Sequence, residues 1–141
     1  MVQEQQLDER TKSILQECRE LINTDIPALE ECIREMQLQT ISSPKLDGMP
    51  HGSAAGDAMA NRLKRLEKYE SELAHNRRRL ERLQSAARRA TRALEARRRI
   101  FYESYYVCGE KASVARTEAG ISDRTATRYI NEVRTRYEAG D

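Results

Sequence analysis

The stretch GISDRTATRYINEV (residues 120–133) concentrates side chains that can bond nucleic acid along one side of an expected helix. At about 3.6 residues per turn, Ala126 and Val133 fall on the apolar side of that helix. The opposite side carries guanidinium, hydroxyl and amide groups, which bond phosphates and base edges. The candidate DNA-binding residues are Arg116, Ser122, Arg124, Thr127, Arg128, Asn131, Arg134 and Arg136.

These candidates have different expected roles. A helix in the major groove reads bases mainly with its N-terminal residues, which favours Arg124, Thr127 and Arg128. Either arginine can bond guanine through two hydrogen bonds, and the threonine can contact a thymine methyl group or a phosphate. Asp123 suits the helix dipole, but near DNA it must either avoid phosphate or accept from cytosine, and both alternatives stay open. The candidates for contact with the sugar-phosphate backbone are Arg116, Arg134 and Arg136.

The residues just before this helix predict a tight turn. Gly120 can adopt the left-handed conformation that ends a helix, and Ile121 would fill the corner. The Ser122 hydroxyl can accept a hydrogen bond from a backbone N–H of the first turn of the next helix. A glycine, an apolar residue and a cap in this order are typical of a helix-turn-helix.

Residues 100–141 are expected to form that helix-turn-helix module. The segment IFYESYYVCG (residues 100–109) holds the only phenylalanine and three of the six tyrosines, which predicts a small independent core. In the short helix that follows, Val114 and Ala115 should face inward. The alternative interpretation is a three-helix cap with a solvated arginine face.

The rest of the chain is predicted to be helical, so the fold class is all-α. Residues 1–41 form an acidic helical arm, which NTDIP (residues 23–27) divides into two short helices or kinks as one. Residues 42–57 are rich in Pro and Gly and predict a loop. Residues 58–99 form a long basic helix, and the absence of Pro and Gly up to Val107 predicts an unbroken rod.

The long helix carries an imperfect heptad seam. Leu66, Leu73 and Leu80 share one core position, and Asn76 and Leu83 share the other. In a parallel homodimer the flanking charges would be complementary, and the asparagine would set the register. The alternative is that the same stripe packs on the helices of the acidic arm within one chain.

Charge is distributed unevenly along the chain. The net charge is +2, but residues 1–50 carry 5 basic and 10 acidic groups, while residues 51–141 carry 20 and 13. The second part therefore has an excess of positive charge, which favours a polyanionic partner such as double-stranded DNA.

Several classes of protein are disfavoured. No apolar run is long enough for a membrane span, and the polar, acidic N-terminus does not resemble a secretory signal, so a reducing cytoplasm is expected. Three cysteines without a CxxC pair and two distant histidines support neither disulfides nor a metal site. No Gly-rich phosphate loop or Cys-His pairing indicates catalysis, and no cofactor is expected.

The motif G-I-S-x-x-T-x-x-R-Y resembles the helix-turn-helix of sigma-factor promoter-reading domains and of RinA/ArpU-type phage late transcriptional regulators. SSPKLDGMPHG ahead of RLKRLEKYESEL is similar to proteins of the same group, so the resemblance covers residues 41–137. It implies activation of late phage genes at promoter DNA, with host RNA polymerase as a partner. In many such scaffolds a small residue lies four before the turn glycine, whereas this chain has Arg116 there and Ala115 one earlier.

The sequence thus predicts an all-α, dimeric regulator of transcription that binds double-stranded DNA. Two alternatives stay open. One is a phage packaging component of the small-terminase kind, which combines a helix-turn-helix with coiled-coil helices in a ring. The other is an adaptor coiled coil that binds protein through its stripe and does not bind DNA; salt-sensitive binding to duplex DNA would argue against it.

Overall fold

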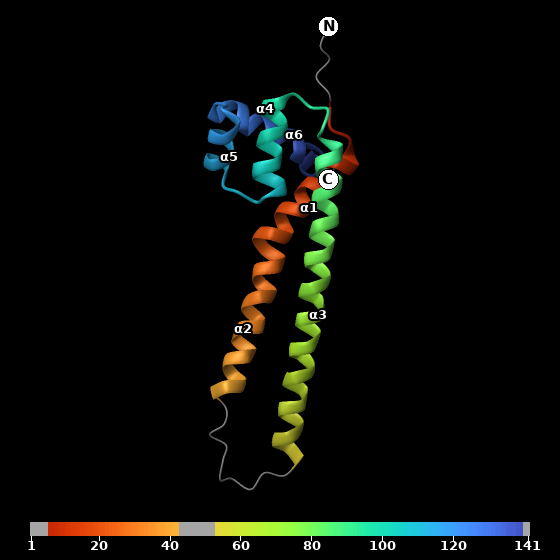
Figure 1. The fold of residues 1–141 in the computed structure, drawn as a ribbon, viewed down its shortest axis with the longest axis vertical. Coiled ribbons are helices and arrows are strands. Elements are labelled where there is room, and N and C mark those ends of the chain that lie inside the picture. The colour runs from red at the N-terminus through yellow and green to blue at the C-terminus, as the bar shows by residue number, and fades with distance from the viewer. Residues whose placement is uncertain (1–5, 43–52, 140–141) are drawn as a thin grey trace. The chain divides into compact units, whose positions relative to one another are not determined.

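The computed structural model describes the backbone of residues 6–42 and 53–139, and the side chains of residues 6–39 and 56–134. Helices dominate the described residues, and no strand occurs among them, which confirms the all-α prediction (Figure 1). Residues 43–52 of the predicted loop lie outside the description. None of the helices within it has a stretch long and apolar enough to cross a bilayer.

The N-terminal arm is helical on both sides of the predicted interruption. Helix α1 (Glu9–Glu20) is capped by Asp8, whose Oδ1 accepts a hydrogen bond from the Thr11 N–H at 2.7 Å. A π-helical turn, η1 (Leu21–Asp25), then leads directly into α2 (Ile26–Ser42). The turn overlaps NTDIP at residues 23–25, and it changes the helical hydrogen-bond pattern without separating two helices.

The long helix is shorter at its C-terminal end than the sequence predicts. Helix α3 spans Ser53–Ala90, and a turn at residues 91–95 separates it from α4 (Ala96–Tyr102). The Thr91 hydroxyl bonds the Ala87 carbonyl at 2.9 Å, and the Glu95 carboxylate accepts from the N–H groups of Arg97 and Arg98. The predicted rod up to Val107 is therefore wrong, because the backbone bonds change to the i→i−3 pattern at Arg92 and Leu94, and Glu95 then caps α4, all without Pro or Gly.

The C-terminal elements follow the predicted order. Helix α4 continues into a π-helical segment, η3 (Glu103–Val107), and Gly109 with φ 71° ends it. Helices α5 (Ala112–Ala119) and α6 (Asp123–Ala139) complete the chain.

The chain divides into two compact units. The first unit comprises Met1–Thr24 and Arg79–Asp141, and the second comprises Asp25–Arg78. The first unit therefore contains α1, the last part of α3 and all the C-terminal helices. The second contains α2 and the Ser53–Arg78 part of α3.

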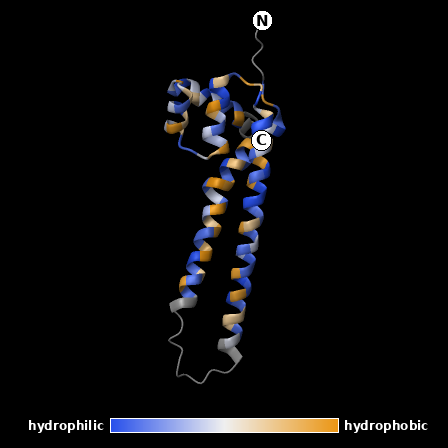
Figure 2. Ribbon diagram, in the orientation of Figure 1, coloured by the Kyte–Doolittle hydropathy of each residue, from blue (hydrophilic) through white to orange (hydrophobic). Residues whose placement is uncertain are grey.

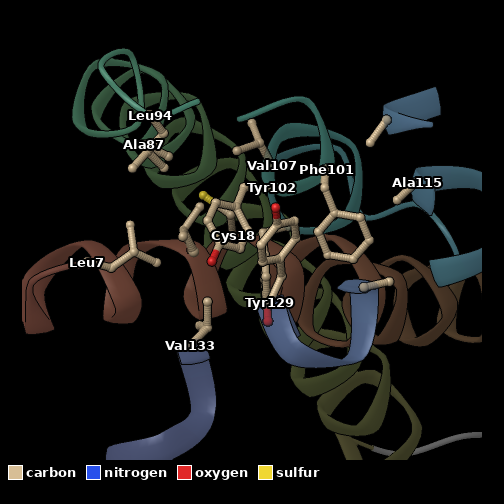
Figure 3. Packing of buried hydrophobic residues seen from close by; sticks show 14 residues of the cluster. Leu7, Cys18, Ala87, Leu94, Phe101, Tyr102, Val107, Ala115, Tyr129 and Val133 are labelled. Carbon is tan, nitrogen blue, oxygen red and sulfur yellow. The ribbon is translucent and has the colours of Figure 1, made fainter. Parts of the chain in front are cut away.

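The first unit has one core shared by all of its helices, as Figure 3 shows. Phe101 and Tyr102 of α4 are fully buried there, and so are Leu15 and Cys18 of α1. Burial raises the pKa of the Cys18 thiol to about 11. The prediction of a small independent core within residues 100–141 is therefore wrong, since α1 supplies part of it.

Contacts between α1 and η3 strengthen this shared packing. The Arg19 guanidinium donates to the carbonyls of Tyr105 at 2.6 Å and Glu110 at 2.8 Å, and its Cζ lies 3.7 Å from the centroid of the Tyr105 ring. A Cβ added at Gly109 would lie 2.6 Å from the Ile22 side chain. Only glycine fits this close approach of the loop to η1.

The second unit is a pair of helices that lie side by side (Figure 1). Arg77 Nη2 of α3 lies 2.8 Å from Glu30 Oε2 of α2. Ile33 and Leu73 are buried.

The predicted oligomerisation residues are partly used within the single chain. In the second unit Leu73 is buried and Leu66 and Asn76 are half-buried, while in the first unit Leu80 and Leu83 pack against the core. The seam thus takes part in packing within one chain, which was the alternative to the coiled-coil dimer. The homodimer stays a prediction.

Candidate nucleic-acid interface

The corner between α5 and α6 has the geometry that the sequence predicts. Gly120 adopts φ 66° and ψ 40°, the left-handed conformation. Its N–H bonds the Thr117 carbonyl, and the Ile121 N–H bonds the Arg116 carbonyl, each at 3.2 Å. These two bonds satisfy carbonyl groups at the end of α5 and turn the chain sharply.

Ser122 caps α6 as predicted. Its Oγ accepts a hydrogen bond from the Thr125 N–H at 3.2 Å and donates to the Thr125 hydroxyl at 3.1 Å. This use of the hydroxyl fixes the first turn of α6. The Ser122 side chain is exposed at the N-terminal end of α6, where it serves as the cap of the helix.

Helix α6 has one buried side and one exposed side. Ala126, Tyr129 and Val133 are buried in the core of the first unit, and Tyr129 approaches Phe101 with ring centroids 5.9 Å apart. The exposed side carries the predicted base-reading set and its neighbours, namely Arg124, Thr127, Arg128, Asn131 and Arg134.

A shallow hollow of about 540 Å³ runs along this exposed side. Its lining includes Arg124, Thr127, Arg128 and Asn131, so the structure brings these predicted residues together. The Arg128 Cζ lies 5.4 Å from the centroid of the neighbouring Tyr129 ring. Thr125 and Glu132 complete the lining, so the hollow presents two guanidinium groups, two hydroxyls, an amide and a carboxylate to the same region.

Arg116 is already engaged within the module. Its Nε lies 2.7 Å from Asp123 Oδ1, in an ion pair that lacks the alignment of a hydrogen bond. This pair joins α5 to the first turn of α6 and partly neutralises the carboxylate. It also gives Asp123 a protein partner, an arrangement that neither of the two sequence alternatives included.

Arg134 and Arg136 are the other two arginines predicted to contact the sugar-phosphate backbone. Arg134 is exposed and borders a second hollow of about 370 Å³, together with Arg19 and Tyr106. The side chain of Arg136 lies outside the described residues.

Val114, predicted to face inward, is 37% exposed, whereas Ala115 is fully buried. Helix α5 therefore packs through Ala115 and Ala119, so the small residue at position 115 serves in place of one at 116.

Sequence reasoning missed a polar cluster behind α6. Arg98 Nη2 lies 2.7 Å from Glu132 Oε2, and the Tyr102 hydroxyl accepts from Arg98 Nε at 3.2 Å and donates to the same carboxylate at 3.4 Å. Burial raises the pKa of Tyr102 to about 12. The cluster links α4 to α6 and pairs Glu132, the acidic residue in the middle of α6, with a cation.

A second arginine of α4 supports the corner. Arg97 Nη1 donates to the Gly120 carbonyl at 2.7 Å. The only sequence signal for these roles is the spacing of Arg98 and Tyr102, which places both on one side of α4.

Comparisons of this chain with protein-family models, with curated proteins and with solved structures give no match. The interface is therefore interpreted from its own geometry. An exposed helix face with two arginines and neutral polar groups, whose nearby carboxylates are paired with protein cations, can bond to an anionic duplex and to base edges.

Proposed function

We propose that this chain binds double-stranded DNA in a sequence-specific manner and regulates transcription, with α6 as the recognition helix. The observation that carries the proposal is the division of α6. Ala126, Tyr129 and Val133 are buried, while Arg124, Thr127 and Arg128 point away from the core. A helix held on one side and exposed on the other can enter a major groove without unfolding any of the module.

The charges around α6 support DNA as the partner. Asp123 is paired with Arg116, and Glu132 is paired with Arg98. Each carboxylate close to the exposed face is thereby partly neutralised by a cation of the protein. Arg124 and Arg128 keep their charge for phosphate or guanine, because neither forms an ion pair within the described residues.

The chemical composition of the face favours sequence-specific binding over general attraction to phosphate. Guanidinium, amide and threonine groups prefer different base edges, so a face that combines them can discriminate between base pairs. The resemblance to RinA/ArpU-type regulators extends the proposal to activation of late phage genes. In that role the protein would act at promoter DNA together with host RNA polymerase.

The test starts by selecting bound fragments from the source genome with the full chain, at stated salt concentration. On the selected site, Arg128→Ala should weaken binding by about 1 to 3 kcal/mol and relax selectivity at one base position. Arg10→Ala is the matched control, because it removes an exposed arginine from α1. Equal effects of the two changes, or the absence of any selected sequence, would contradict the proposal.

A further inference from the structure

Helix α3 carries a regular row of polar and basic side chains in the second unit. The row comprises Lys64, Lys68, Ser71, His75 and Arg78, at successive spacings of four, three, four and three residues. This spacing keeps all five on one side of a helix, in the same way that a heptad pattern aligns an apolar seam. In the sequence the same spacing continues through Arg82, Ser85 and Arg89.

The row lies opposite the packed side of the helix. All of its side chains are exposed, whereas Leu73 is buried and Leu66 and Tyr69 are half-buried. Figure 2 shows the same alternation, with hydrophobic positions recurring along an otherwise hydrophilic α3. The row is therefore free to contact a partner while the seam stays packed.

Charges are sorted between this row and the other sides of α3. Between Lys64 and Arg78 the acidic residues are Glu67, Glu70 and Glu72, and all three fall outside the row. Arg77, which also lies outside it, is paired with Glu30 of α2. Lys64, Lys68 and Arg78 form no ion pair among the described residues. A helix face that only needed solvation would tolerate mixed signs, and such mixing stabilises helices through pairs of opposite charge.

We propose that this row is a second, sequence-independent binding surface for the phosphates of double-stranded DNA. The inference rests on the proposed function for the choice of DNA as the polyanion. Lys64 and Arg78 are 14 residues apart, which corresponds to about 21 Å of helix. Duplex DNA carries one negative charge per about 1.7 Å of its axis, so about a dozen phosphates fall within that length.

An anionic membrane is the main competing partner, and the packing of α3 argues against it. Interfacial helices insert a large apolar face below the lipid headgroups. The apolar side of α3 instead contains Leu73, which is buried in the second unit. Leu63, next to Lys64, is 47% exposed, but a single leucine is much less than the apolar face that insertion below the headgroups requires.

The experiment measures how binding of the full chain to a random-sequence DNA duplex depends on salt. Lys64→Gln/Lys68→Gln removes two charges from the row. Arg34→Gln/Arg65→Gln is the matched control, since it removes the same charge from exposed positions of the same unit outside the row. The slope of log K against log salt should fall in magnitude by about 1.8 for the row variant and stay unchanged for the control. Thermal unfolding verifies that both variants are folded.

The possible results separate the two proposals. Equal changes of slope in both double variants, or no change in either, would overturn the row as a binding surface while leaving α6 untouched. Binding to phosphatidylserine vesicles that the row variant abolishes, with the DNA slope unchanged, would also overturn it in favour of a membrane. Conversely, if the row variant lowers the slope but the wild type prefers no sequence, only the proposed function of α6 fails.

Discussion

Helices α4 and α6 both carry several arginines and use them in opposite ways. In α4 the three consecutive residues Arg97, Arg98 and Arg99 all donate hydrogen bonds to groups of the protein itself. In α6 Arg124 and Arg128 are exposed, and neither takes part in an ion pair among the described residues. The number of arginines in a helix therefore does not tell how many are available to a partner.

The difference arises from what each helix faces. Helix α4 lies against the end of α5 and the middle of α6, where Gly120 offers a carbonyl and Glu132 a carboxylate. Arg97 there donates to an exposed carbonyl, and Arg98 neutralises a partly exposed carboxylate. Helix α6 places its buried side against aromatic rings, and Arg124 and Arg128 lie on its exposed side. Substitutions in α4 should consequently reduce stability, and those in α6 should reduce binding.

The largest effect on stability should come from Arg98→Ala. This change leaves Glu132 without its cation and removes a partner of the Tyr102 hydroxyl, which should lower the free energy of unfolding by about 2 to 3 kcal/mol. The value is below that of a fully buried pair because the Glu132 side chain is 37% exposed. Arg128→Ala is the control and should change stability by less than about 0.5 kcal/mol. Urea unfolding of both variants measures the two losses of stability. Equal shifts of the two unfolding midpoints would contradict the prediction.

A smaller effect, with a pH dependence, is expected for Tyr102→Phe. The loss of the hydroxyl removes its bonds with Arg98 and Glu132 and should cost about 1 kcal/mol at neutral pH. Because burial raises the pKa of Tyr102 to about 12 from 10.0, the folded state holds this proton more tightly than the unfolded state. The contribution of the protonated Tyr102 hydroxyl to the free energy of unfolding is thus fully present below about pH 10. It is lost as the pH rises from there toward 12.

Denaturant unfolding at a series of alkaline pH values tests this prediction. The wild type should lose stability more steeply than the phenylalanine variant as the pH rises above the ordinary tyrosine value. Burial also raises the pKa of Tyr106, so the Tyr102→Phe variant should still lose some stability as the pH rises. Parallel curves for the two proteins would show that Tyr102 does not titrate differently in the folded state.

The local features of the interface could be predicted from the sequence. Gly120, Ile121 and Ser122 specify a turn and a cap through their own backbone preferences and side-chain groups, and the structure shows the predicted conformation at each step. The exposed and buried sides of α6 followed from helical periodicity in the same way. These properties depend on residues close together in the chain.

Features that depend on distant residues could not be predicted. Nothing in the local pattern indicates that Leu15 and Cys18 complete the core around Phe101, because that contact joins segments more than 80 residues apart. The break at residues 91–95 has no Pro or Gly and consists of i→i−3 backbone bonds followed by the Glu95 cap of α4. A count of basic residues likewise could not tell that Arg98 is paired and Arg128 is exposed. The difference depends on whether the fold places a carboxylate such as Glu132 next to the guanidinium.

The smallest effect tests whether α4 also positions the corner of the interface. Arg97→Ala removes the donor to the Gly120 carbonyl and should cost about 0.5 to 1 kcal/mol, because the carbonyl is exposed and water can replace the guanidinium. Arg99→Ala removes the same charge but only a longer bond, 3.4 Å to the Arg92 carbonyl, and serves as the control. If Arg97 positions the corner, its variant should bind the selected DNA site more weakly than the Arg99 variant does. Equal affinity of the two variants would limit the role of Arg97 to stability, because a displaced corner would shift the first turn of α6 relative to the groove.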